Sequence, residues 1–453
     1  MKNFPVLLTL VLLLVVSGTV MAQNPSTSTA DSLTLQMNSL KKDLGILKRI
    51  KVSGYLQPQF QYADSAGQPS FAGGNFAAGV DKRFMIRRGR VKFQYTSPVN
   101  EKGIATSQYV LQLDATDRGI AVKDVYVKIS EPWTGYFSLT AGMFNNPFGH
   151  EITYSSSQRE SPERGRMSQL HFPNEREVGV MLTIQPPKSS KLNWLRLDAG
   201  FFNGIGSPSA GVDVSDFDNK KDFISRLSMT RTTTSKKISY GAGVSYYDGG
   251  FRIDSVTVYE NGKDANGTTG FIIDSRAIDN GPVQIGSRNH TRRNYIGADA
   301  QFAVEWKAGT TALRGEFITG EQPGNSTSTK SPNDKNPIVK DVYARNFNGA
   351  YFYFVQDLFT SPFQVVVKYD WYDPNTDVEG NDIGQSMIGS AKASNETDIR
   401  YDTWGFGLLY HFDANIRFMA YYDVVNNETS NNLQGFTKDR NDNVFTLRMQ
   451  VKF

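Results

Sequence analysis

Three cationic residues stand at alternate positions in the segment FMIRRGRVKFQY: Arg88, Arg90 and Lys92. In a β-strand, side chains two residues apart point to the same face and lie about 7 Å from one another. The residues beside them, such as Val91 and Phe93, are apolar and suit lipid, so the cations would face water. A row of cations on a water-filled wall raises the local concentration of anions without holding them tightly. The pattern therefore predicts that Arg88, Arg90 and Lys92 are pore-lining cations.

The segment 145–175, NNPFGHEITYSSSQRESPERGRMSQLHFPNE, is a second candidate site. It is too long for a simple turn, and it mixes charges with apolar residues that could anchor it. We expect it to fold into a lumen and to set the narrowest point there. The constriction candidates are Glu151, Arg159, Arg164 and Arg166. The alternative is an exposed surface loop, which would need few apolar anchors.

Strands would have to position both sites. From Ile50 onward most apolar residues alternate with polar ones, which is typical of strands with one apolar face. Segments of about ten residues suit a strand that crosses a membrane at a tilt. Sixteen such segments can be delimited: 50–62, 83–96, 105–115, 121–130, 135–144, 176–185, 192–203, 221–231, 237–247, 292–306, 310–320, 343–357, 363–373, 400–412, 415–425 and 444–453.

The connections between these segments alternate in length. Short ones, such as SEPWTG, KAG and DA, follow long ones, and only 116–120 is short where a long one is due. An even number of strands joined in this way is typical of an outer-membrane barrel with short periplasmic turns and longer outer loops. We therefore predict a 16-stranded antiparallel transmembrane β-barrel over 50–453. The alternative is a soluble β-sandwich, which would bury one face of each strand in a thin core.

The last segment, NVFTLRMQVKF, keeps its alternation up to the final residue, Phe453. Chain ends are usually frayed, so a strand that runs to the last residue needs a partner. We expect it to pair with the first strand and to close the barrel, so that neither strand has a free edge. Phe453 would then face lipid at the periplasmic rim, in the aromatic girdle.

The N-terminal residues 1–22 have the pattern of a secretory signal peptide cleaved after Ala22, with a lysine, an apolar run and small residues in order. The apolar run is too short for a comfortable spanning helix; the alternative is a retained N-terminal anchor. We expect the protein to be exported.

Residues 23–49 contain a polar linker and then apolar residues spaced four and three apart: Leu33, Met37, Leu40, Leu44 and Leu47. This spacing predicts a short periplasmic coiled-coil helix of about two heptads. Two heptads are marginal alone, so the coil would depend on oligomerisation by the barrel. The alternative is an amphipathic helix that lies on its own chain.

The composition of the 453-residue chain excludes several classes of function. Cysteine is absent, which excludes a disulfide framework, a thiol enzyme and a Cys-bound zinc site. The 49 basic and 45 acidic residues give a net charge of +4, which is too balanced for a nucleic-acid partner. The four histidines are scattered and none has a partner at metal-ligand spacing. We predict no enzymatic activity, no cofactor and no metal site.

Three stretches carry a resemblance to a known family: GYLQPQFQY, FMIRRGRVKFQY, and the run from KDVYVKI to FSLTAGMFNNPFGHEITYSSSQRESPE. They resemble the phosphate-selective porin O and P family of outer-membrane porins. The resemblance implies a sixteen-stranded barrel that forms homotrimers, a third loop folded into each pore, and passive anion uptake. The pair Arg88 and Arg90 matches the basic pair in the family's second strand.

The chain departs from this family at one point. The phosphate-specific members carry lysines in the third loop shortly after an FG-x-E turn, where this chain has Ile152 and Ser157. The stretch 145–177 holds four arginines and five glutamates, so it adds no net positive charge. We predict a porin in a Gram-negative outer membrane that lets small solutes diffuse passively, with a mild preference for anions, phosphate-type anions among them. Its partners would be outer-membrane lipid and two further copies in a homotrimer. The alternative is a non-conducting outer-membrane scaffold or adhesin barrel.

Overall fold

The structure is a computed structural model, and it describes residues 29–173, 175–206, 216, 218–252, 257–274, 290–331 and 341–453. The chain divides into two units, Met1–Ile50 and Lys51–Phe453. The predicted signal peptide lies outside the described residues. In the described part of the first unit the chain forms the helix α2 (Thr29–Leu47), which contains the predicted helical segment.

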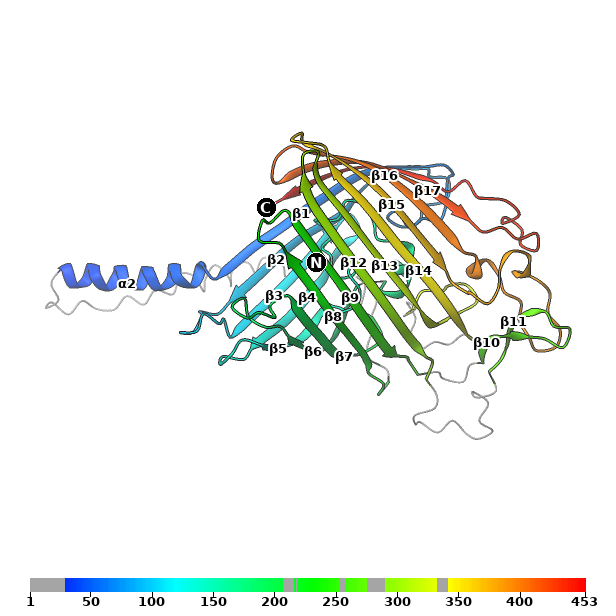
Figure 1. The fold of residues 1–453 in the computed structure, drawn as a ribbon, viewed down its shortest axis with the longest axis horizontal. Coiled ribbons are helices and arrows are strands. Elements are labelled where there is room, and N and C mark those ends of the chain that lie inside the picture. The colour runs from blue at the N-terminus through cyan, green and yellow to red at the C-terminus, as the bar shows by residue number, and fades with distance from the viewer. Residues whose placement is uncertain are drawn as a thin grey trace, which may run out of the picture. The chain divides into compact units, whose positions relative to one another are not determined.

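The second unit is a closed antiparallel barrel of sixteen strands, as predicted. Its first and last strands pair with each other, from Tyr55 opposite Lys452 to Ala63 opposite Val444. The barrel strands are β1 (Ile50–Ala63), β2 (Lys82–Thr96), β3 (Ser107–Thr116), β4 (Gly119–Ser130), β5 (Phe137–Asn145), β6 (Arg176–Ile184), β7 (Leu195–Phe202), β8 (Asp222–Thr232), β9 (Ile238–Gly249), β12 (Arg293–Trp306), β13 (Gly309–Gly324), β14 (Val342–Asp357), β15 (Phe363–Asp373), β16 (Tyr401–His411), β17 (Ile416–Asn427) and β18 (Val444–Lys452). Figure 1 shows them running obliquely side by side.

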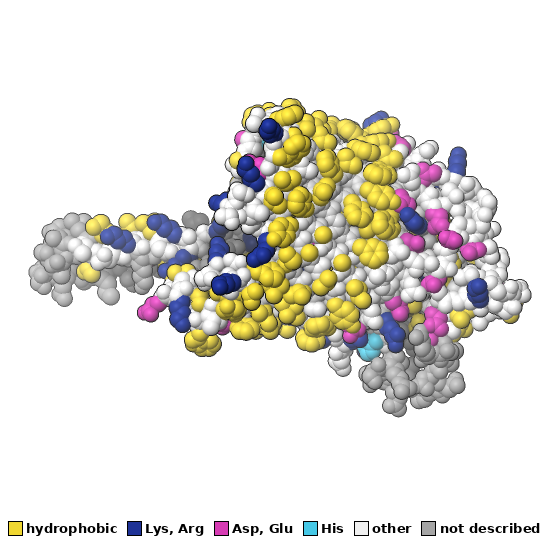
Figure 2. Space-filling model, viewed as in Figure 1, with side chains coloured by type: hydrophobic (Ala, Val, Ile, Leu, Met, Phe, Trp, Pro, Cys, Tyr) yellow, Lys and Arg dark blue, Asp and Glu magenta, His cyan; other side chains and the backbone are white. Residues whose placement is uncertain are grey.

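Alternation along each strand separates a buried polar face from an exposed apolar one. In β1, Gln57, Gln59 and Gln61 are buried, whereas Leu56 and Tyr62 are about two-fifths exposed, at 41% and 42%. The visible outer wall is covered by hydrophobic side chains, and charged side chains gather toward the ends of the strands (Figure 2). The barrel therefore turns its apolar face outward, opposite to a soluble protein.

The C-terminal residue completes the barrel closure. The amide of Phe453 donates to the carbonyl of Gly54, and the amide of Gly54 donates back to Phe453, at 3.0 and 2.9 Å. A Cβ atom at position 54 would lie 2.4 Å from the Phe453 ring, so only glycine leaves room for this aromatic side chain. The Phe453 side chain is 64% exposed, in line with a position facing lipid at the rim.

Two interruptions of the alternation turn extra cations inward. Consecutive side chains of a regular strand point to opposite faces. In β2, however, Arg87 and Arg88 are consecutive and both bind the carboxylate of Glu163. In the β3–β4 pairing the register shifts between Gln112 and Leu113, which leaves Lys123 of β4 unpaired. A β-bulge of this kind reverses the faces of the residues that follow it.

The remaining strands, β10 (Val258–Lys263) and β11 (Thr269–Ile273), form a hairpin outside the barrel wall, and sequence analysis did not predict it. The hairpin pairs in parallel with the start of β14, where Val258 lies opposite Val342. It belongs to the long connection between β9 and β12, at the end of the barrel away from the C-terminus (Figure 1). Aromatic residues Tyr259, Phe271 and Tyr343 bury one another there.

The helix α2 exposes the apolar residues that suggested a coil. Met37, Leu40 and Leu47 are 56%, 59% and 62% exposed. Among the described residues, no helix combines the length and apolar character needed to cross a membrane. Pairing of this helix with other copies stays a prediction.

Candidate functional site

The third connection on the long-loop side, which runs from the end of β5 at Asn145 to the start of β6 at Arg176, lies inside the barrel. We call it the inner loop. On one side Ser156 Oγ bonds to the hydroxyl of Tyr55 in β1 at 2.6 Å. On another side the amides of His150 and Glu151 donate to Glu316 Oε2 of β13 at 2.8 and 2.9 Å. The inner loop therefore crosses the lumen from wall to wall.

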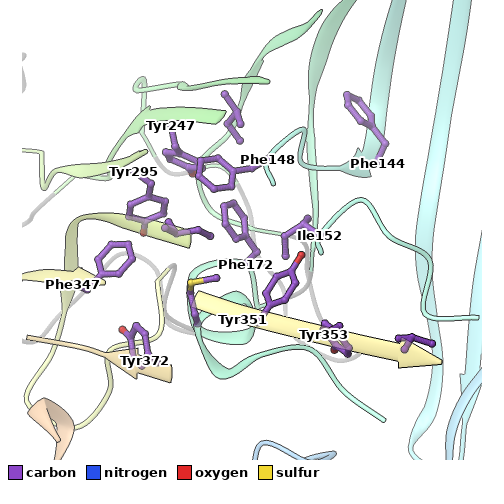
Figure 3. Packing of buried hydrophobic residues seen from close by; sticks show 14 of the residues in the cluster. Phe144, Phe148, Ile152, Phe172, Tyr247, Tyr295, Phe347, Tyr351, Tyr353 and Tyr372 are labelled. Atoms are coloured by element: carbon purple, nitrogen blue, oxygen red, sulfur yellow. The ribbon is translucent and has the colours of Figure 1, made fainter. Parts of the chain in front are cut away.

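Apolar residues of the inner loop fix it to the wall formed by β9, β12 and β14. Phe148 and Ile152 are fully buried, and the Phe148 ring lies 5.0 Å from that of Phe172. Figure 3 shows Phe148 and Phe172 near Tyr247 and Tyr295 of the wall, and Ile152 beside Tyr351. The cluster fills this side of the lumen, so a passage must lie elsewhere.

A charged anchor fixes the second half of the inner loop. Glu163 accepts hydrogen bonds from Arg87 at 2.8 and 2.9 Å, from Arg88 at 2.7 Å and from Arg448 of β18 at 3.1 Å. Burial alone would raise the pKa of Glu163, but the surrounding arginines, Arg87 foremost, hold this pKa well below its usual range. The carboxylate is therefore ionised at neutral pH and binds the loop to β2 and β18, the strands on either side of β1.

Two of the predicted constriction residues, Glu151 and Arg164, brace the inner loop itself. The Glu151 carboxylate accepts the amide of Gly165 at 3.1 Å. The Arg164 Nε donates to the backbone carbonyl of Glu151 at 2.9 Å, and its guanidinium also pairs with Glu175. These contacts close the loop into a compact turn.

The other two constriction candidates have different surroundings. Arg159 is only 2% exposed, and its three guanidinium nitrogens make no hydrogen bond within the described structure. Arg166 begins the short helix α3 (Arg166–His171). Its guanidinium lies 3.6 Å from the ring centroid of Tyr401 and 4.3 Å from that of Phe71, which is the geometry of a cation held between two aromatic faces.

The inner loop leaves a chamber of about 580 Å³ against the wall of β1 to β8. The basic and acidic side chains that line it are unequal in number, with seven cations and three carboxylates. They are Arg90, Lys92, Lys128, Arg164, Arg176, Arg196 and Arg226, against Asp124, Glu175 and Asp198. The excess of cations gives the chamber a positive potential.

A slot of about 30 Å³ lies on the other side of Arg164, which lines both spaces. The slot is bounded by the first outer loop at 69–72, by the inner loop and by β15 to β18. Its charged residues are Glu163, Arg164, Arg166, Lys368, Asp370, Asp423 and Asp442. Arg164 thus stands where the wide chamber meets the narrow slot.

The three predicted pore-lining cations differ in their partners. Arg88 is bound to Glu163, and Arg90 Nε lies 3.1 Å from Asp114 Oδ2 on the neighbouring strand. The acidic partners of both arginines therefore come from outside β2, one from the inner loop and one from β3. Lys92 lines the chamber and has no ion pair in the part of the chain that the structure describes.

Sequence reasoning missed Arg87 and Lys123 because it assumed unbroken alternation. A signal was present: the exposed apolar residues Phe84 and Ile86 stand at even positions before Arg87, whereas Val91 and Phe93 stand at odd positions after it. The same change of phase flanks Lys123 in β4, with Val122 before it and Val125 after it. The role of Glu163 had no such local signal, because its partners lie 75 or more positions away. Within the described residues, no cluster of acidic or histidine side chains is arranged to hold a metal ion.

Comparisons with known proteins give a fold and no family. No family model matches the chain, and no curated protein matches its sequence. The anion-selective porin from Comamonas acidovorans aligns with a TM-score of 0.51 and 9% identity, covering 89% of this chain and 99% of that chain. The trimer form of OmpT, an outer membrane protein of Vibrio cholerae, aligns with a TM-score of 0.49 and 11% identity, covering 89% of this chain and 99% of that chain. The outer membrane channel DcaP of Acinetobacter baumannii aligns with a TM-score of 0.49 and 10% identity, covering 89% of this chain and 97% of that chain.

The likeness to the Comamonas structure concerns the fold alone. The fold is that of an outer-membrane porin barrel. A closed antiparallel barrel satisfies every backbone group without water, and its apolar outer surface suits lipid. These features place the protein in an outer membrane of the Gram-negative type.

Proposed function

We propose that the protein is a porin through which small solutes diffuse passively, with a mild preference for anions. The observation that carries this proposal is the chamber, where seven cationic side chains face three carboxylates. In a lumen of low dielectric walls, such an excess favours anions over cations. Most of these cations are bound to carboxylates, so the preference should be modest.

The free charge comes mainly from two lysines. Lys92 and Lys128 line the chamber, and neither has a carboxylate within 4 Å in the described structure. Arg176 and Arg196, by contrast, pair with Asp124 at 3.0 Å and with Asp198 at 2.6 Å. An ion already paired attracts a passing solute less than a free one does. Lys92 and Lys128 are therefore the residues expected to set the selectivity.

Membership of the phosphate-selective porin O and P family is also a proposal. Three stretches resemble this family: one in β1, one in β2, and one that runs from β4 into the inner loop. This resemblance supports the proposal, and so does the position of the inner loop within the lumen. The absence of lysines at positions 152 and 157 argues against tight phosphate binding. Phosphate would pass as one small anion among others.

A homotrimer in outer-membrane lipid is the assembly we propose. The exposed apolar residues of α2 support it, because a heptad face left in water favours contact with other copies. The apolar outer wall of the barrel supports contact with lipid and with neighbouring barrels (Figure 2). No catalytic role is proposed.

Liposome swelling tests whether the lumen is open. Vesicles containing the purified protein should swell in isotonic small sugars and in salts of small anions. A protein that inserts but gives no swelling would be a non-conducting scaffold or adhesin barrel, the alternative function.

The source of the selectivity is tested by substitution. The double variant Lys92→Gln with Lys128→Gln should shift the reversal potential in a KCl gradient toward cations. Lys188→Gln, an exposed lysine of the 185–194 turn that does not line the chamber, is the matched control and should leave the potential unchanged. An equal effect of the double variant and of Lys188→Gln on the reversal potential would show that the chamber does not lie on the ion pathway.

A further inference from the structure

The wall of the chamber is not uniformly polar. Tyr126, Phe144, Pro147 and Met181 line one part of it. The Tyr126 and Phe144 rings are 5.9 Å apart in an edge-to-face arrangement. These residues come from β4, β5, the start of the inner loop and β6, so they form a continuous apolar patch across neighbouring strands.

The register of the strands keeps this patch flat. Tyr126 lies opposite Gly142, and Met181 lies opposite Gly200. A Cβ atom at position 200 would come 3.0 Å from the Met181 Cα. Because these neighbours lack side chains, the apolar groups lie against the wall without filling the chamber.

A free cation borders the patch. Lys128 follows Tyr126 by two residues on β4, which puts both on the inner face about 7 Å apart. Lys128 has no carboxylate within 4 Å among the described residues, whereas the adjacent Arg196 is bound to Asp198 at 2.6 Å. The hydroxyls of Thr140 and Thr183 line the same part of the chamber.

From this juxtaposition we infer that the chamber binds organic monocarboxylates with an aromatic or similarly flat apolar body. The carboxylate meets Lys128, and the ring lies on the patch of Tyr126, Phe144 and Met181. Inorganic anions and acetate contact only Lys128, because they have no apolar body that could lie on the patch. This inference deepens the proposed porin function by naming the class of solute that the chamber retains.

Phe144 and Met181 belong to the same buried cluster as Phe148, and Tyr126 packs against it. The Phe144 ring lies 5.5 Å from that of Phe202, and Figure 3 shows Phe144 at the edge of the cluster. The patch is therefore the part of this cluster that reaches the chamber. An apolar surface that lines a water-filled space is costly unless something covers it. An apolar solute that passes through covers it transiently.

Benzoate and acetate test the inference, because they carry the same charge and differ in the ring. Benzoate should reduce the chloride current through single wild-type channels at a concentration about tenfold lower than acetate, the factor expected when one ring face leaves water. Lys128→Gln should weaken block by benzoate. Met181→Gln, which keeps the length of the side chain, should bring benzoate close to acetate.

Met85→Gln is the matched control, since Met85 faces Gln59 inside the barrel at 3.4 Å but does not line the chamber. It should leave block by benzoate unchanged. Equal block by benzoate and acetate in wild type, or equal effects of Met181→Gln and Met85→Gln, would overturn the inference while leaving the porin function intact.

Calorimetric titration of the purified protein with benzoate separates the two proposals. Saturable binding that Met181→Gln weakens and Met85→Gln preserves would support the site, even for a protein that carries no current. Absence of current would overturn the porin function alone. Absence of saturable binding would overturn the site, whether or not the protein carries current.

Discussion

Glu163→Gln tests how the inner loop is held. In the wild type one carboxylate accepts bonds from Arg87, Arg88 and Arg448 at 2.7 to 3.1 Å, in an environment where Arg88 and Arg448 are 3% and 4% exposed. The amide keeps the shape but removes the charge, so three cations are left without compensation. Breaking a buried ion pair from one side costs about 3–5 kcal/mol.

The expected result is therefore a loss of about 3–5 kcal/mol in the free energy of unfolding, measured by urea titration of the protein in detergent. The loop should also loosen at its second half, so single channels should conduct more and with greater noise. Glu101→Gln, on the exposed turn between β2 and β3, is the control and should change neither quantity. A Glu163→Gln protein within about 1 kcal/mol of wild type would show that the arginines do not depend on this carboxylate.

The pH dependence follows from the lowered pKa of Glu163. A carboxyl whose pKa is lower in the folded state stabilises the fold above its unfolded pKa, about 4.3, and loses that contribution as pH falls through the folded pKa. The stability difference between wild type and Glu163→Gln should thus be constant from neutral pH to about 5 and shrink only in more acidic solution. A difference that vanishes already near pH 6 would contradict the lowered pKa.

Three further predictions follow from other regions. Burial raises the pKa of Asp442 in the last outer loop to about 6, so acidification through pH 6 should remove a negative charge from the slot and increase anion preference. Asp442→Asn should abolish this step, and an unchanged titration in the variant would contradict it. Deletion of Phe453 should reduce assembly in the outer membrane but not the conductance of each inserted channel, because its ring packs on Gly54 at the lipid-facing rim; normal surface levels of the truncated protein would count against this. Leu40→Ser with Leu44→Ser should lower the melting temperature of the oligomer only slightly, since two heptads contribute little, whereas a rise in conductance would mean that the helix plugs the pore.

The strands were predictable because each carries a local signal. Alternation located β15 (Phe363–Asp373) at its observed bounds and β14 (Val342–Asp357) to within one residue. The pairing of the last strand with the first followed from the same pattern, because a terminal strand without a partner would fray. The hairpin of β10 and β11 was not predicted because its strands are short, and they pair with each other and with the start of β14 outside the regular barrel wall.

The chemistry of the candidate site was predictable only in part. The inward direction of Arg90 and Lys92 is a consequence of strand period, and the partner Asp114 could have been found from the register of β2 against β3. The ion pairs of Arg88 and Arg448 with Glu163 depend on how the inner loop folds back across the lumen. Such contacts join distant positions through tertiary structure, and no local pattern specifies them.

The central claim is that the barrel contains an open path with a mild preference for anions. The reversal potential of wild-type single channels across a tenfold KCl gradient tests it most directly. We predict discrete conductance steps and a potential with the sign of chloride preference, well short of the value for a channel permeable to chloride alone. A potential with the opposite sign, or membranes that hold the inserted protein and carry no current, would contradict the account.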